Sequence, residues 1–215
     1  MRVVDIENCS RKNVYKLFRN MDYPYIGFTV NVDVTDLVLC CKANSFSLFR
    51  VVMFLASKAC NSIKEFKYRF LGEKVVEYDI VHPSYTLMVK DDAFNFCTVL
   101  FTEEFKEFNR RAIDESNKLI GNLNLDHEED RSDLIFISCI PWISFTHVLH
   151  PIGLYPTDSI PRVAWGKYFE QGSRILMPVN VQAHHALMDG FHIGIFYQKL
   201  DNEMAAFVKN SGDYC

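Results

Sequence analysis

A chain of 215 residues with 49% hydrophobic and 23% charged residues has the composition of a soluble globular protein with a sizeable core. The net charge of -4 and the absence of a long basic run exclude the electrostatic footprint of a nucleic-acid-binding protein. The seven cysteines show no C-x-x-C spacing, so neither a zinc site nor a dithiol redox motif is indicated. We expect no secretory signal, no membrane span and no metal, and we expect reduced thiols in a cytoplasmic protein.

The first half of the chain alternates helical and strand-like patterns. A short amphipathic helix is expected with Val14, Leu17 and Phe18 on one face, and a later helix with a mostly apolar surface is expected to be buried against a sheet. In chain order we expect a helix over 10–20, a strand over 26–34, helices over 36–43 and 47–63, and a hairpin formed by strands 66–70 and 74–78.

The second half predicts further strands and two long helices. In chain order we expect strands over 85–89 and 94–101, a helix over 103–120 and an acidic solvated loop over 126–133. A strand over 134–139 and a Pro-bounded loop to 161 follow. Two strands are then expected around 171–172, the second over 175–183, before a helix over 190–208. This order predicts an α/β (α+β) two-layer sandwich, a large mixed β-sheet with covering helices, in a single domain over 1–215. The face of the sheet without helices could meet a neighbouring subunit.

The most informative segment runs from Val181 to Gly190, where a strand leads directly into a turn and a helix. Alternation along the strand places His184 and His185 on opposite faces, which disfavours a zinc site built from both. His185 continues the apolar row of the strand, where partial burial favours a neutral ring that can act as a general base. On residue chemistry alone, a core histidine bonded to the backbone remains the alternative.

Several motifs resemble those of one enzyme family. The His-His-x-x-x-Asp-Gly pattern at 184–190 is similar to the signature of chloramphenicol acetyltransferases and of the acyltransferase cores of 2-oxoacid dehydrogenase complexes. Further segments resemble chloramphenicol acetyltransferases and extend the resemblance, in order and at matching spacing, over nearly the whole chain. They are DVTDL (33–37), EFKYRF (65–70), VVEYD (75–79), HPSYT (82–86), ISCIPWISFTH (137–147) and AWGKYFEQGSRILMPV (164–179).

The resemblance implies a role for four residues. His185 would take the proton from a substrate hydroxyl, and Ser138 would donate its hydroxyl to the tetrahedral oxyanion. Asp189 and Arg11 would form an ion pair that holds the turn carrying His185, as site-supporting residues. Without the resemblance, Ser138 would be interpreted as an ordinary strand serine and Arg11 as part of a surface ion pair. His192, on the predicted last helix, receives no role.

Residues of the acceptor pocket are also implied by the resemblance. They are Phe18, Tyr25, Ile26, Phe94 and His150. This sequence departs from the best-known enterobacterial members at four positions, where Cys9 replaces a tryptophan, Phe18 a tyrosine, Ala164 a threonine and His150 a leucine. The hydroxyls lost at positions 18 and 164 put the affinity for the drug and the turnover rate in question.

The family resemblance therefore predicts acetyl-CoA-dependent O-acetylation of chloramphenicol, by direct transfer in a ternary complex. It also implies a homotrimer with active sites between subunits, His185 coming from one subunit and much of the acceptor pocket from its neighbour. Two alternatives remain open. One is transfer of acetyl to dihydrolipoamide or to another small alcohol, although the sequence has no lipoyl domain or Ala/Pro linker. The other is a non-catalytic relative that binds an apolar ligand.

Overall fold

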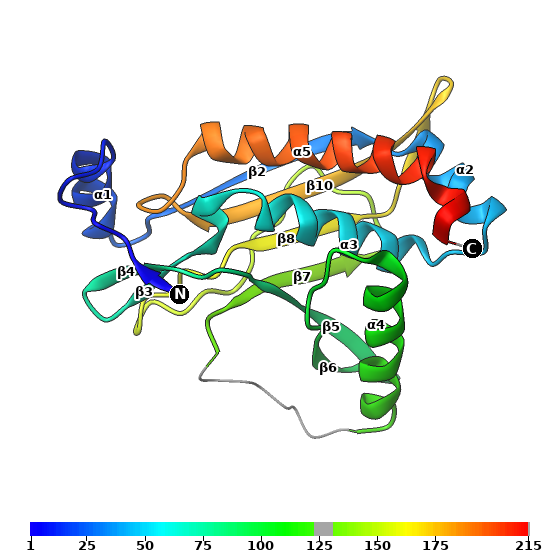
Figure 1. Ribbon diagram of the computed structural model, residues 1–215, viewed down its shortest axis with the longest axis horizontal. Helices are drawn as coiled ribbons and strands as arrows, with labels where there is room; N and C mark the ends of the chain where they lie inside the picture. The colour runs from blue at the N-terminus through cyan, green and yellow to red at the C-terminus, as the bar shows by residue number, and fades with distance from the viewer. Residues whose placement is uncertain (123–130, 215) are drawn as a thin grey trace.

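The computed structural model describes residues 1–122 and 131–214. Its centre is a mixed sheet of seven strands in the order β2-β10-β8-β7-β5-β6, with β9 paired to the start of β10 (Figure 1). The strands β5, β7 and β8 pair in parallel, whereas the other neighbours pair antiparallel. The strands are β2 (Tyr25–Asp33), β5 (His82–Lys90), β6 (Ala93–Thr98), β7 (Leu134–Ile140), β8 (Arg162–Gly166), β9 (Phe169–Gln171) and β10 (Arg174–His184).

Helices cover one face of this sheet, as expected for a two-layer sandwich. Figure 1 shows α5 and α3 running across the strands, α2 beside the end of α5, α4 next to β5 and β6, and α1 at the far end of the molecule. The helices are α1 (Lys12–Arg19), α2 (Thr35–Ala43), α3 (Leu48–Asn61), α4 (Phe105–Leu119) and α5 (Gly190–Lys209), with short 3-10 turns at Lys64–Lys67 and Ser211–Tyr214. Within the described part of the chain, none of these helices has the length and apolarity needed to cross a membrane.

The core lies between the helices and the sheet because apolar residues alternate along the central strands. Val179, Val181 and Ala183 of β10 are all buried and belong to the same apolar cluster as Phe196 of α5. Phe196 stacks on Phe66 at a centroid distance of 5.3 Å. Burying a side chain of this size contributes roughly 1.5–3 kcal/mol, so the alternation fixes which face of β10 meets the helices.

The opposite face of β10 is polar and is covered by the irregular segment 141–161. Asn180, Gln182 and His184 alternate with the core residues and are nevertheless buried. The backbone N–H of His150 donates to the side chain of Gln182 at 2.9 Å. Gly166 permits the close approach of this segment, because a Cβ at that position would lie 2.8 Å from the carbonyl oxygen of Ile143. The uncovered remainder of this face is where a ligand or another chain can approach.

Several expected boundaries differ from the structure. Phe66 lies in a 3-10 turn and not in a strand, because β3 (Tyr68–Leu71) begins later and pairs with β4 (Lys74–Glu77) and β1 (Arg2–Val3) in a separate small sheet. The strand expected to continue to 101 ends at Thr98. Leu17, expected on the apolar face of the first helix, is 58% exposed. The acidic loop expected over 126–133 lies, as far as Asp130, outside the described residues.

Candidate active site

The turn between β10 and α5 carries the His-His motif. The strand ends at His184, and α5 begins at Gly190. Asp189 is the N-cap of α5, and its carboxylate accepts a hydrogen bond from the backbone N–H of Phe191 at 3.0 Å. A carboxylate at this position satisfies a free helix N–H and complements the positive end of the helix dipole. The cap therefore fixes where the turn stops and the helix starts.

His185 is half-buried in this turn and its ring has a defined orientation. Its backbone N–H donates to the carbonyl of Pro24 at 2.7 Å. The Phe18 ring stacks on the imidazole at a centroid distance of 3.7 Å and an interplanar angle of 16°. Nδ1 lies 3.2 Å from the carbonyl oxygen of Met188. Because a carbonyl can only accept, this contact assigns the proton to Nδ1 and leaves the lone pair on Nε2.

Arg11 and Asp189 meet behind His185. The guanidinium of Arg11 forms a short ion pair with Oδ2 of Asp189, and its other terminal nitrogen donates to the carbonyl of His185 at 3.4 Å. Burial acts to raise the pKa of Asp189, but the hydrogen bond and charge of Arg11 outweigh it and hold this pKa below its usual value. The arginine thus ties α1 to both ends of the turn that carries His185.

His184 points to the other face of the sheet, as alternation requires. Its ring is only 2% exposed and meets the edges of Tyr25 and Phe70 at centroid distances of 5.0 and 4.8 Å. Nδ1 accepts from the backbone N–H of Ala186 at 3.2 Å. Among the residues described, no group of three or more His, Cys, Asp or Glu side chains is placed to hold a metal ion.

Two buried histidines predict acid sensitivity of the fold. Burial lowers the pKa of His184 and of His150 from 6.5 to about 4. The unfolded chain therefore binds more protons than the folded chain between about pH 6.5 and pH 4, so stability falls as the pH is lowered through this range. We expect urea midpoints to decrease over this interval and to decrease less in His184→Gln, which lacks one of the two groups. An equal decrease in both proteins would contradict this explanation.

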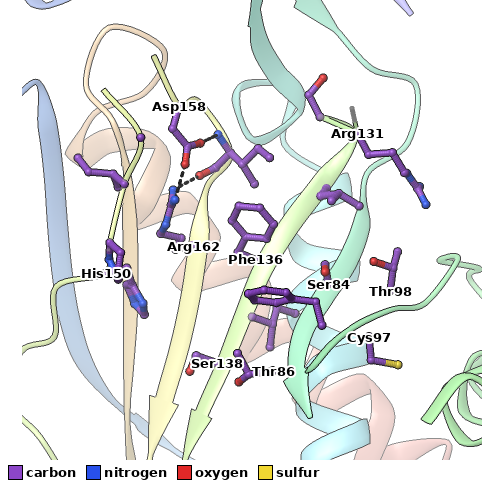
Figure 2. A pocket seen from close by; sticks show the side chains of 18 of the residues that line it. Ser84, Thr86, Cys97, Thr98, Arg131, Phe136, Ser138, His150, Asp158 and Arg162 are labelled. Atoms are coloured by element: carbon purple, nitrogen blue, oxygen red, sulfur yellow. Dashed lines mark hydrogen bonds and ion pairs between the residues drawn. The ribbon is translucent and has the colours of Figure 1, made fainter. Parts of the chain in front are cut away.

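A second group of expected site residues lines a cavity of about 1160 Å³ that extends over the face of the sheet without helices and reaches the end of α4. We call it the sheet-face cavity. Ser138 on β7, Phe94 on β6 and His150 on the segment 141–161 all contribute to its wall. Figure 2 shows Ser138 beside Thr86, on the neighbouring strands β7 and β5 that form the floor of the cavity, and His150 on the side of Arg162. Because side chains alternate along β7, the Ser138 hydroxyl lies on the same face of the sheet as Phe136, which is the face that lines the cavity.

The sheet-face cavity also contains a buried ion pair that the sequence did not predict. Arg162 on β8 pairs with Asp158, and its guanidinium lies 5.3 Å from the centre of the Phe136 ring (Figure 2). Arg162 also donates to the carbonyl of Ile160 at 2.8 Å. The cavity wall therefore combines aromatic rings with a neutralised charged pair, which suits a ligand with both apolar and polar groups.

Within one chain, His185 and Ser138 belong to different groups, which touch where Tyr25 is hydrogen-bonded to Asp158 of the cavity wall. His185, Phe18, Tyr25 and Ile26 are absent from the described wall of the sheet-face cavity. Tyr25 donates its hydroxyl to the carbonyl of Asp158 at 2.6 Å, while Ile26 packs against the hydrophobic core. One chain therefore presents a histidine group at the β10–α5 turn and, separately, a cavity with the serine.

Comparison of the sequence with known protein families identifies the family of this chain. The family model described as chloramphenicol acetyltransferase matches residues 1–201. The chain belongs to the chloramphenicol acetyltransferase family. A chloramphenicol acetyltransferase of Clostridium perfringens is 30% identical to it, over 92% of this chain and 91% of that protein. One of Proteus mirabilis is 26% identical, over 89% of each chain.

Solved structures agree on the fold. A chloramphenicol acetyltransferase structure superimposes with a TM-score of 0.82 at 25% identity, covering 95% of this chain and 100% of that one. A probable dihydrolipoamide acetyltransferase from Listeria monocytogenes reaches a TM-score of 0.68 at 12% identity, covering 94% and 93%, and so shares the fold. As a member of the chloramphenicol acetyltransferase family, the protein is an acyltransferase. The mixed-sheet sandwich expected from the sequence is confirmed.

Besides the Arg162–Asp158 pair, two further features of the site were not predicted from the sequence. The carbonyl of Met188 orients the His185 ring, but a backbone group leaves no trace in the residue pattern. His192 lies beside Asp189 at the start of α5. Its position three residues after the N-cap is where a capping-box side chain occurs, and this spacing was a usable signal.

Proposed function

We propose that this member of the chloramphenicol acetyltransferase family transfers an acetyl group from acetyl-CoA to a hydroxyl of chloramphenicol and thereby inactivates the antibiotic. The observation that carries the proposal is the orientation of His185. Its Nδ1 faces the Met188 carbonyl, so Nε2 is free to accept a proton. Family membership supports the substrates, and the mixed apolar and polar wall of the sheet-face cavity suits the aromatic acceptor.

In the proposed reaction, Nε2 of His185 takes the proton from the acceptor hydroxyl. The oxygen attacks the thioester carbonyl of acetyl-CoA and forms a tetrahedral intermediate. The carbon–sulfur bond then breaks, and the imidazolium returns its proton to the departing thiolate of CoA. The acetyl group passes directly to the acceptor in a ternary complex, and no acyl-enzyme forms. A neutral imidazole suits both steps because it accepts and returns one proton near neutral pH.

Ser138 is proposed to stabilise the tetrahedral intermediate. Its hydroxyl would donate to the oxyanion that develops on the former thioester oxygen. The strand β7 supports the role by fixing the serine on a rigid floor, between β5 and β8. Ala164 lies next to Ser138 on β8 and supplies no hydroxyl. Ser138 would therefore act without help from that neighbouring side chain.

The active site is proposed to form between copies of the chain in a homotrimer. Within one chain, His185 is not part of the described wall of the sheet-face cavity, so the base of one copy would face the cavity of the next. Phe18 and Tyr25 would join the site from the side of the histidine, and Phe94 and His150 from the cavity. Large apolar side chains exposed near the cavity support an interface. They include Leu149 at 64%, Leu154 at 44% and Tyr155 at 96% exposure.

Mixing two inactive variants tests the assembly. His185→Ala keeps Ser138, and Ser138→Ala keeps His185, so a site formed between two such chains can contain both residues. Random co-assembly at equal amounts should restore about a quarter of the sites. Light scattering should give the mass of three chains. If co-assembled trimers show no more activity than the separate variants, the site is formed within one chain and the proposal is wrong.

The acceptor can be identified by product analysis. The protein is incubated with acetyl-CoA and either chloramphenicol or dihydrolipoamide, and acetylated products are measured by mass spectrometry. We expect O-acetyl chloramphenicol and no acetyl-dihydrolipoamide. The reverse result would assign the protein to the second acceptor class. Binding of chloramphenicol without any product would favour the non-catalytic alternative.

We also propose that the protein acts in the cytoplasm. The six described cysteines are Cys9, Cys40, Cys41, Cys60, Cys97 and Cys139, and all six are free. Free thiols are typical of a reducing compartment. Acetyl-CoA serves as co-substrate in this proposal, and no metal takes part in the steps above.

A further inference from the structure

His192 lies at the centre of a network of polar side chains behind the catalytic turn. It is the third residue of α5, and its side chain is 10% exposed. Nε2 lies 3.4 Å from Oε1 of Glu65, a carboxylate whose side chain is 9% exposed. Nδ1 faces residue 189. Neither His192 nor Glu65 has a place in the mechanism above, although two poorly exposed ionisable groups in contact require a physical reason.

The first contact of His192 reaches His185 through one peptide unit. The backbone N–H of Asp189 points at Nδ1 of His192 at a distance of 3.2 Å. The carbonyl of the same peptide unit, that of Met188, lies 3.2 Å from Nδ1 of His185. Because a peptide is planar, fixing its N–H also fixes its C=O. His192 thus sets the direction of the carbonyl that orients the catalytic ring.

The second contact of His192 reaches the Asp189 carboxylate. Nδ1 lies 2.9 Å from Oδ1 of Asp189, while Oδ2 is bound by Arg11. A neutral His192 ring accepts from the Asp189 N–H through Nδ1, and a positively charged ring would attract the nearby Asp189 carboxylate instead. Residue 189 is therefore held by His192 in either charge state. Arg11 holds the same residue from the opposite side and also reaches the carbonyl of His185.

Glu65 fixes the His192 ring from behind. Burial acts to raise the pKa of Glu65, but the hydrogen bond from His192 brings it below its usual value, so the carboxylate stays ionised. Nζ of Lys64 also lies 3.8 Å from Oε1 of Glu65, and the lysine side chain is 63% exposed. An ionised carboxylate at Nε2 keeps the proton on that nitrogen. This leaves Nδ1 of the neutral ring free to accept from the Asp189 N–H.

We propose that His192, held by Glu65, is a positioning residue that fixes the Met188–Asp189 peptide and thereby selects the tautomer and orientation of the His185 ring. The expected change in kcat rests on the proposed function. The expected change in the tautomer and orientation of the His185 ring does not depend on any substrate. Without His192, the Met188 carbonyl can rotate away. His185 is then no longer held as the Nδ1–H tautomer, in which Nε2 is the base.

Two substitutions at position 192 test the inference. Glutamine is the usual side chain at this position of a capping box and can accept from the N-cap N–H, whereas leucine cannot. We expect His192→Leu to lower kcat about tenfold with KM values for both substrates unchanged within about twofold. His192→Gln should recover most of the lost kcat. Nitrogen-15 spectra of the His185 ring should show the Nδ1–H tautomer in the parent protein and in His192→Gln, and loss of this preference in His192→Leu.

His82 provides a matched control. Its Nδ1 also accepts from a backbone N–H, that of Phe101 at 3.0 Å, and its Nε2 also faces a carboxylate, Asp133 at 3.8 Å. His82→Leu should lower thermal stability and leave the His185 tautomer and kcat unchanged. If His192→Leu does not fold, Glu65→Leu breaks the same network from its other end and should give the same change in the His185 ring.

Two results would overturn the inference. One is an unchanged His185 tautomer and kcat in a folded His192→Leu or Glu65→Leu protein. The other is a loss of activity in His192→Leu that His82→Leu reproduces, since this would reflect stability alone. Failure of the proposed function is distinguishable. It would appear as a parent protein that makes no acetylated product, and the ring spectra need no substrate to decide the structural part.

Discussion

Replacing His185 with alanine is expected to lower kcat about ten-thousand-fold, which is the upper range for loss of a general base. The side chain supplies Nε2 as the only proposed acceptor for the hydroxyl proton, and alanine leaves the acceptor oxygen un-ionised beside the thioester. The KM values should change little, because the imidazole contributes to the transition state more than to binding. Steady-state rates with saturating acetyl-CoA and chloramphenicol give the measurement.

The neighbouring histidine is the matched control. His184 faces the opposite side of the sheet, and asparagine at this position can still accept from the Ala186 N–H. His184→Asn should therefore reduce kcat by less than about tenfold. If both substitutions abolished activity equally, the assignment of the base to His185 would fail.

The fold could be predicted from the sequence where burial of an element leaves a clear pattern of apolar residues. Val179, Val181 and Ala183 face the core, and the same alternation turns His184 to the other side. The apolar surface of the helix expected at 47–63 likewise matches α3, of which nine residues are buried. In both elements the apolar residues are buried where the sequence pattern places them, so the pattern of side chains and the backbone geometry agree.

Predictions of strand boundaries failed where the local residue pattern and the pairing with distant strands favour different structures. The stretch around Phe66 is apolar enough for a strand, but its backbone turns because Phe66 itself packs under α5, and pairing with β4 begins only at Tyr68. Before Gln171, the chain forms two strands, β8 and β9, and β8 inserts between β7 and β10. Such parallel pairing depends on partners far along the chain, which short windows do not contain.

The candidate site was predictable in part and for a different reason. His185, Ser138, Asp189 and Arg11 were identified through motif resemblance, because a single histidine or serine carries no functional signal in its own pattern. The resemblance also implied that His185 and much of the acceptor pocket come from different subunits, which the residue pattern alone does not indicate. The pairs Arg162–Asp158 and His192–Glu65 were also missed. Arg162, Asp158 and Glu65 are ordinary charged residues whose meaning comes only from burial and contact in the folded chain, whereas His192 was signalled only by its spacing from the N-cap.

Replacing Ser138 with alanine is expected to lower kcat by about a hundredfold to a thousandfold, because one donor to the oxyanion is lost. The side chain lies on the floor of the sheet-face cavity and would meet the thioester oxygen only after it becomes charged. The KM values should therefore stay within about threefold of those of the parent protein. Ser84 on β5 offers a matched control, since its hydroxyl lines the same cavity next to Phe136. Ser84→Ala should retain nearly full kcat. A Ser138→Ala defect confined to KM would instead make this serine a binding residue, and the intermediate would then need another donor.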